Sequence, residues 1–94
     1  MLLILTTNDA PGYRITKLVG EVSGLSILTP RLTKAGMTKM FMEAREGALE
    51  QLSENARQAG ANAVIAMRFD SNELGGAYVE ILAYGTAVVI EPLN

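Results

Sequence analysis

The sequence predicts an α+β domain in which one long helix packs on a four-stranded, mainly antiparallel sheet. A charged stretch with helical spacing ends at Gly60, and an alternation of apolar and polar residues, typical of a strand, begins almost at once. Strand-like stretches also lie before and after this pair. The elements are therefore expected in the order strand, strand, helix, strand, strand. With 94 residues the chain is long enough for one domain, and we assign residues 1–94 to a single unit.

The N-terminal third is expected to form two strands. The first covers the apolar residues 2–6, which are followed by a turn at residues 8–12. Strand-type residues then dominate residues 13–28, and this stretch contains Gly20 and Gly24 on one face. A glycine inside a strand commonly marks a bulge or the close approach of another element. We therefore expect such an irregularity at these two positions.

The helix is expected over residues 30–59. Thr29 is a suitable N-cap, and Pro30 fits the first helical position, where its missing N–H costs nothing. Thr38 offers a second N-cap if the helix is interrupted near Gly36. Apolar residues at spacings of three and four predict a core-facing stripe that narrows to alanine and would let the helix lie close to a sheet. The stripe consists of Met37, Phe41, Ala44, Ala48, Leu52, Ala56 and Ala59.

The C-terminal third is expected to form two more strands. Gly60 should end the helix with a positive φ, because the left-handed conformation does not strain glycine. The alternation in residues 62–70 indicates a strand with Ala63, Ile65, Met67 and Phe69 on one face. Residues 71–77, with two consecutive glycines, are interpreted as a hairpin loop, and a strand follows over residues 78–91. This last strand is apolar on both faces, and one helix can cover only one of them. We expect another subunit to cover the second.

Composition excludes several classes of function. The net charge of −2 gives no electrostatic footprint for nucleic acid or an anionic membrane, so neither is an expected partner. The chain has no cysteine and no histidine, which excludes nucleophilic triads and thiolate or imidazole metal sites within one chain. We assign no catalytic residue, no metal ligand and no cofactor. The opening MLLIL is too short for a signal peptide or a spanning helix, and we expect a cytoplasmic protein.

Two groups on the helix could be taken for metal sites. Met37, Met40 and Met42 could supply thioethers for copper(I), but the same residues fit an apolar helix face, and we favour core packing. Three carboxylates spaced four apart form an acidic row that could attract a hard cation or a basic partner. We favour a solvated outer face. The row consists of Glu46, Glu50 and Glu54.

Three further carboxylates are the speculative ligand candidates. Asp70 and Glu73, with Asn72, precede the two glycines and offer oxygen ligands, although calcium loops need more ligands at regular alternation. Glu80 shares a strand face with apolar and aromatic neighbours, and a buried carboxylate needs a partner. We favour a structural role for it over a functional one. Its candidate partners are Arg14, Lys17 and Arg68.

Three stretches resemble the YbjQ-like family of small bacterial and archaeal proteins, which is often labelled heavy-metal-binding. They are KLVGEVSGLSIL, AREGALEQLSENARQAGANAVIAMRFD and GTAVVI, and the resemblance covers residues 13–91. It implies an α+β subunit that assembles into a ring-shaped homopentamer, with no established activity. The segment KAGMTKMFMEA departs from the family, since it is shorter and lacks the usual diglycine, arginine, serine, tyrosine and glutamate. We do not carry the metal label over to a chain without histidine and cysteine.

These observations predict a homo-oligomeric structural or ligand-binding module without catalysis of its own, with itself as the expected partner. The pentameric state comes from the resemblance, whereas the apolar content of 49% favours association in general. The alternative is a protein that binds hard metals or small ligands, or an enzyme, whose site forms at subunit interfaces. Its candidate residues are Asp70, Glu73 and Glu80.

Overall fold

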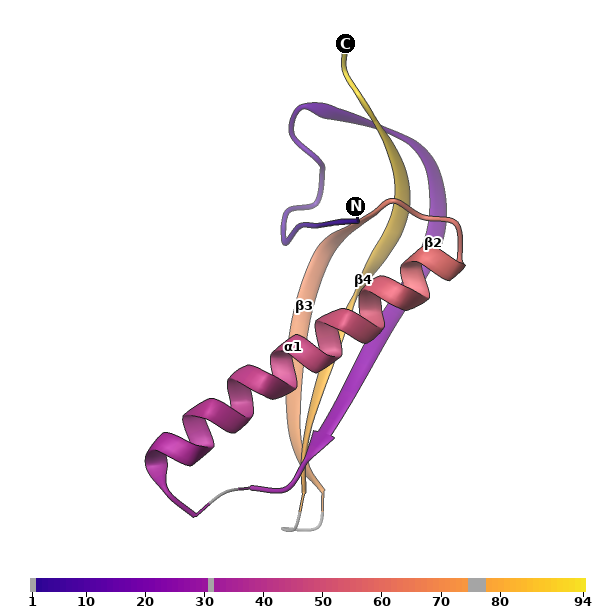
Figure 1. Cartoon of the computed structure of the whole chain (residues 1–94). Coiled ribbons are helices and arrows are strands. Elements are labelled where there is room, and N and C mark those ends of the chain that lie inside the picture. The colour runs from indigo at the N-terminus through magenta and orange to yellow at the C-terminus, as the bar shows by residue number, and fades with distance from the viewer. Residues whose placement is uncertain (1, 31, 75–77) are drawn as a thin grey trace.

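The structure is a computed structural model that describes residues 2–30, 32–74 and 78–94. The elements are β1 (Leu3–Ile4), β2 (Tyr13–Leu28), α1 (Lys34–Gln58), β3 (Ala63–Leu74) and β4 (Tyr78–Pro92). The sheet has the order β1-β3-β4-β2, in which β1 and β3 are parallel and the other pairs antiparallel. The predicted α+β class and element order are confirmed, and the sheet is mixed (Figure 1).

The helix begins later than predicted. Thr33 is the N-cap, and its side-chain oxygen accepts a hydrogen bond of 2.9 Å from the Gly36 amide. The assignment of Thr29 as N-cap with Pro30 at the first helical position is wrong. Both residues belong to the connection between the end of β2 at Leu28 and the N-cap at Thr33. The alternative of a second N-cap at Thr38 does not occur: α1 is continuous past Gly36, and the Thr38 hydroxyl donates to the Lys34 carbonyl over 3.2 Å.

The helix ends as predicted at Gly60. This residue has φ +91°, in the left-handed region that favours glycine. Its amide donates to the Arg57 carbonyl over 3.0 Å, and the Ala61 amide donates to the Ala56 carbonyl over 3.0 Å. These two bonds define a Schellman motif, which satisfies carbonyls that the helix end would otherwise leave unpaired. The chain therefore reverses over a few residues and enters β3.

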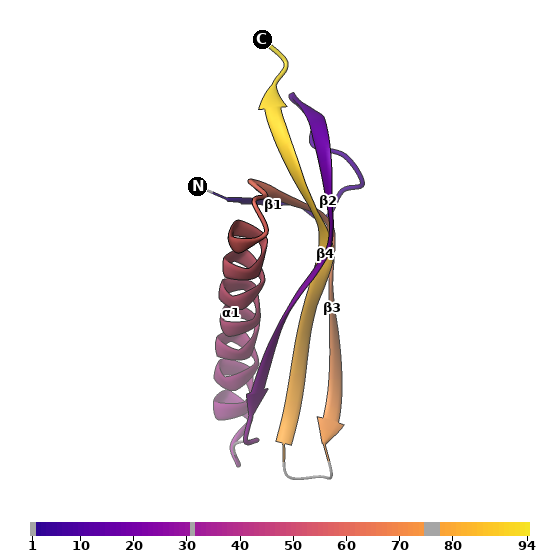
Figure 2. The same cartoon turned by 90° about the vertical axis from the view of Figure 1, so that its right-hand side faces the viewer.

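The main core lies between α1 and one face of the sheet (Figure 2). The helix residues that are buried in it are Met40, Ala44, Ala48, Leu52 and Ala56. Met37 and Phe41 are only partly buried, and Ala59 is exposed, so the predicted stripe holds in the middle of the helix but not at its ends. The small residues let the helix approach β2 closely. A Cβ on Gly24 would lie 3.0 Å from the Leu52 Cα and closer still to the Ala48 carbonyl oxygen.

The helix also covers part of the free edge of β2. The Leu25 amide donates to the Gln51 side-chain oxygen, and the Asn55 side-chain nitrogen donates to the Ser23 carbonyl over 2.8 Å. Alternate residues of a strand direct their backbone groups to the same edge, so both bonds lie on the edge that faces away from β4. An incoming strand could not pair with β2 at these positions without displacing two helix side chains.

Bulges change the faces that the alternation predicted. In β3 the register shifts between Ile65 and Arg68, and Ala66 has φ +53°. The amides of Ala66 and Met67 donate to carbonyls of the N-terminal segment. Ala63 and Ile65 therefore pack on the side away from α1, whereas Met67 and Phe69 belong to the helix side; the prediction of one shared face is wrong. In β2 a comparable shift ends at Gly20, which has φ +137°.

A second, smaller core covers the upper part of the other sheet face. The N-terminal segment passes around the β3 edge and packs there, as Figure 2 shows, and the buried residues are Ala10, Ala63, Ile65, Val88 and Ile90. The Asn62 side chain extends the sheet at this end, since its Oδ1 accepts from the Ile90 amide over 2.7 Å and its Nδ2 donates to the Ile90 carbonyl over 2.9 Å. The prediction that the chain leaves the second face of the sheet uncovered is therefore correct only for the lower half of that face in Figure 2, beyond the N-terminal segment.

Candidate functional site

The lower half of the sheet face opposite α1 has no covering element in the described chain, and we call it the open face (Figure 2). The strand registers place three rows of side chains on it. From β3 through β4 to β2 the rows are Arg68–Tyr84–Ser23, Asp70–Leu82–Leu25 and Asn72–Glu80–Ile27. The β3 side is polar, whereas Leu25, Ile27 and Tyr84 are 39%, 49% and 38% exposed. Such a cluster of exposed large apolar side chains typically marks an interaction surface.

Two of the three candidate carboxylates lie together on the open face. Asp70 faces Leu82 and Glu80 faces Asn72, which makes the two acids diagonal neighbours on adjacent strands, about 7–8 Å apart in an antiparallel sheet. Glu80 is half-buried. In the described chain no ion pair joins it to Arg14, Lys17 or Arg68. Arg68 instead binds the N-terminal segment: its Nη1 donates a hydrogen bond of 2.8 Å to the Thr6 carbonyl.

Glu73 is separated from these two acids. It pairs in register with Val79, whose side chain belongs to the core under α1, so Glu73 lies on the helix side of the sheet. Residues 71–74 continue β3 and do not form a loop, which corrects the predicted setting of Asp70, Asn72 and Glu73. The rest of the expected hairpin, residues 75–77, lies outside the described residues.

The methionines and the acidic row on the helix do not gather around one point in the structure. Met40 is fully buried whereas Met42 is 53% exposed, so the three neighbouring methionines do not converge on one point. The acidic row is exposed, as expected for a solvated face, and Glu54 forms an ion pair of 3.2 Å with Arg57. Across residues 2–30, 32–74 and 78–94, no three Asp or Glu side chains are grouped so that they could hold a metal ion.

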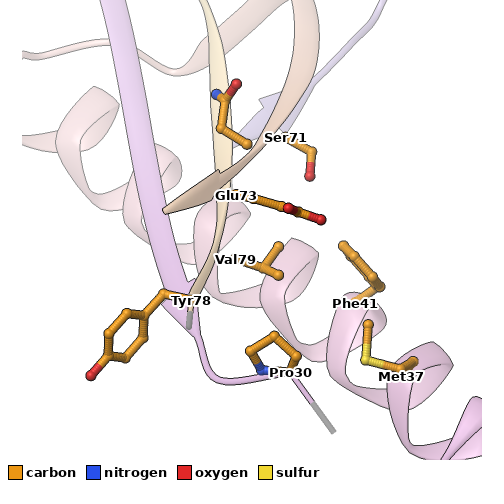
Figure 3. Close-up of a pocket in the computed structure, with 8 residues that line it drawn as sticks. Pro30, Met37, Phe41, Ser71, Glu73, Tyr78 and Val79 are labelled. Carbon is orange, nitrogen blue, oxygen red and sulfur yellow. The ribbon is translucent and has the colours of Figure 1, made fainter. Parts of the chain in front are cut away.

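A pocket of about 500 Å³ opens between the first turns of α1, the last residues of β3 and the first residues of β4. We call it the helix-start pocket. Its lining residues are Pro30, Met37, Phe41, Ser71, Asn72, Glu73, Tyr78 and Val79. Figure 3 shows Met37 and Phe41 on the helix side, Val79 at the centre and Pro30 below. Glu73 extends from the strand toward Phe41, whereas the Tyr78 side chain points away (Figure 3).

The sequence pattern does not predict the helix-start pocket. The spacing assigned Met37 and Phe41 to the core, but α1 crosses the sheet obliquely and its first turns project past the β3 edge (Figure 1). These two side chains therefore contact the core on one side only. Pro30, which the sequence places in the helix, precedes α1 and lies on the pocket wall.

The fold and these surfaces define a small α+β module with a partly apolar open face and, on the other side of the sheet, the helix-start pocket. A family model described as "Putative heavy-metal-binding" (YbjQ) matches residues 33–91. UPF0145 proteins of Acidothermus cellulolyticus and Streptomyces griseus are 40% and 43% identical; the matches cover 99% and 95% of this chain and 99% and 85% of the relatives. The chain belongs to this YbjQ/UPF0145 family, which confirms the resemblance seen in its sequence.

A solved structure supports the fold. A protein with unknown function of the DUF74 family from Pediococcus pentosaceus superposes with a TM-score of 0.71 at 24% identity, over 96% of this chain and 98% of that one. Among the described residues, no helix has the length and apolar character needed to cross a membrane.

We expect this chain to bind zinc or copper no more tightly than an ordinary acidic surface does. Thiolate and imidazole are the ligands that these metals prefer, and the chain has neither. Calorimetric titration of the tag-free protein with zinc chloride should give only weak heats without a defined stoichiometry. A stoichiometric site of submicromolar affinity would show that the family description applies to this chain through oxygen or thioether ligands.

Proposed function

We propose that this chain is a self-assembling module without catalysis of its own, in which copies of the chain cover one another's open faces. The observation that carries the proposal is the exposure of Leu25, Ile27 and Tyr84 on one continuous face. Removing each such side chain from water stabilises a contact by up to about 1.5–3 kcal/mol, and less where it is already half-buried.

The shape of the isolated chain supports this proposal. Its Cα radius of gyration is 15.1 Å, against about 12 Å for a typical domain of this length. Its accessible surface is 5974 Å², whereas a monomeric protein of 10.1 kDa exposes about 5300 Å². The single chain thus leaves more surface in water than a stable monomer of its size usually does, and association would remove the excess.

We infer the mode of contact from a comparison of the β2 edge with the open face. The β2 edge is occupied at Ser23 and Leu25 by helix side chains, so strand addition there is disfavoured. The open face is not blocked in this way. A contact between the open face and a different surface of the next copy is heterologous, and a closed ring leaves no such surface free. We propose a homopentamer as the ring, since that stoichiometry is implied by the family resemblance.

Size-exclusion chromatography with light scattering on the tag-free chain at low micromolar concentration tests the proposal. We expect a single species with a mass near five times 10.1 kDa. A stable monomer would contradict covering of the open face. A dimer or hexamer would contradict only the pentameric stoichiometry.

The alternative function is binding of a hard metal or small ligand at subunit interfaces. The observation that favours it is the placement of Asp70 and Glu80 together on the open face, where a neighbouring copy could add further carboxylates. The same light-scattering measurement in calcium and in a chelator separates the two proposals. A mass that changes with calcium, and no longer changes in Glu80→Gln, would support the metal site; a mass that is the same in both buffers would contradict it.

A further inference from the structure

The helix-start pocket has the size and composition of a small-ligand site. Its volume of about 500 Å³ falls within the range of roughly 300–1,000 Å³ that is usual for such sites. Such sites are mostly apolar and carry a few polar groups that orient the ligand. Here the apolar walls come from Pro30, Met37, Phe41 and Val79, and the polar groups are concentrated at the end of β3.

The apolar walls come from different elements and leave an opening between them. Val79 is 6% exposed and forms part of the core, so the floor of the pocket is fixed by the sheet. Met37 and Phe41 lie one helical turn apart and present a thioether and an aromatic ring from the helix side (Figure 3). A methionine side chain adapts to ligands of irregular shape, and an aromatic face attracts a cation.

The charge of the pocket comes from Glu73. Its carboxylate extends toward Phe41 (Figure 3), and in the described parts of the chain it makes no hydrogen bond or ion pair. No lysine or arginine is among the described residues that line the pocket. The described part of the site therefore combines an apolar wall with one carboxylate that has no cationic partner among residues 2–30, 32–74 and 78–94. An apolar ligand without charge would displace water from this carboxylate without forming a hydrogen bond or ion pair to replace it.

We infer that the helix-start pocket binds a small organic cation, with an apolar body between Phe41 and Val79 and an ammonium group at Glu73. An anionic ligand would meet the carboxylate as a like charge. A bare hard metal ion would find too few oxygen ligands, since it needs six or more. The residues that would hold this ligand, Phe41, Glu73 and Val79, lie on the helix side of the sheet, whereas the exposed apolar side chains that carry the proposed assembly lie on the other.

Nuclear magnetic resonance titration of the 15N-labelled full chain with 2-phenylethylammonium chloride tests this inference. Saturable shifts are expected at the amides of Phe41, Glu73 and Val79, with an affinity on the order of millimolar for so small a probe. The matched probe is 3-phenylpropionate, which has a similar ring and chain but the opposite charge. It is expected to bind at least about tenfold more weakly.

Two variants locate the charge that selects the cation. Glu73→Gln retains the size of the side chain and is expected to weaken binding of 2-phenylethylammonium about tenfold. Glu50→Gln removes a carboxylate from the exposed acidic row and is expected to leave binding unchanged. The inference is overturned if the shifts do not saturate, if the anionic probe binds equally well, or if both variants weaken binding alike.

Discussion

Replacing Gly24 with alanine is expected to destabilise the fold by about 2–3 kcal/mol. The added Cβ would lie within van der Waals overlap of the Ala48 carbonyl oxygen and the Leu52 amide nitrogen. Both atoms belong to the helix backbone, so no side-chain rotation can relieve the overlap, and α1 would have to move away from β2. Such a movement would also weaken the bonds from Gln51 and Asn55 to the β2 edge.

Gly47→Ala is the matched control. A Cβ on Gly47 would meet the Ser26 Oγ at 3.2 Å, which is a tight contact with a side chain that can rotate. Alanine inside a helix is favoured over glycine by about 0.5–1 kcal/mol, and this gain should offset the contact. Urea unfolding followed by circular dichroism, at equal protein concentrations, should give a lower midpoint for Gly24→Ala and a near-normal one for Gly47→Ala. An unchanged midpoint for Gly24→Ala would contradict the close approach of α1 to β2.

The parts of the fold that could be predicted depend on local signals. The helix end at Gly60 follows from the steric freedom of one residue, and the element order follows from changes of period along the chain. The helix start is not predictable in the same way, because Thr29 and Thr33 are equally suitable caps by residue type. The choice between them depends on where β2 ends, and β2 ends where its pairing with β4 ends.

The bulge at Ala66 could not be predicted because its cause lies far away in the sequence. The Ala66 amide donates to the Thr7 carbonyl over 2.7 Å, and this contact exists only once the N-terminal segment has packed beside β3. The space for the bulge comes from Gly85 on β4, where a Cβ would lie 2.7 Å from the Val64 Cγ1. Nothing in the sequence around Ala66 indicates that it will contact Thr7 or lie beside Gly85.

The positions of the candidate carboxylates can be predicted only in part. Beyond the bulge β3 alternates regularly, so the separation of Glu73 from Asp70 follows from their odd spacing once the segment is known to be a strand. The two glycines that follow favoured a loop instead. The helix-start pocket depends on the oblique crossing of α1, which no residue pattern within the helix specifies.

Replacing Ile27 with lysine is expected to dissociate the proposed assembly at low micromolar concentration while the chain stays folded. In the isolated chain Ile27 is 49% exposed and faces Glu80 across β2 and β4, where a lysine can form a cross-strand ion pair. In an assembly that covers the open face, the same lysine would have to leave water. We expect the dissociation constant to rise at least about a hundredfold, which corresponds to about 2.8 kcal/mol.

The matched control for this variant is Leu32→Lys, which makes a comparable exchange at a fully exposed side chain between β2 and α1. Light scattering should report the wild-type mass for Leu32→Lys and a mass near 10.1 kDa for Ile27→Lys, with the same circular dichroism spectrum for both. An Ile27→Lys variant that keeps the wild-type mass would place the contact elsewhere than on the open face. Dissociation of both variants would mean that added positive charge, rather than its position, disrupts assembly. Only a loss confined to Ile27→Lys is explained by burial of the open face, because Ile27 lies on that face and Leu32 does not.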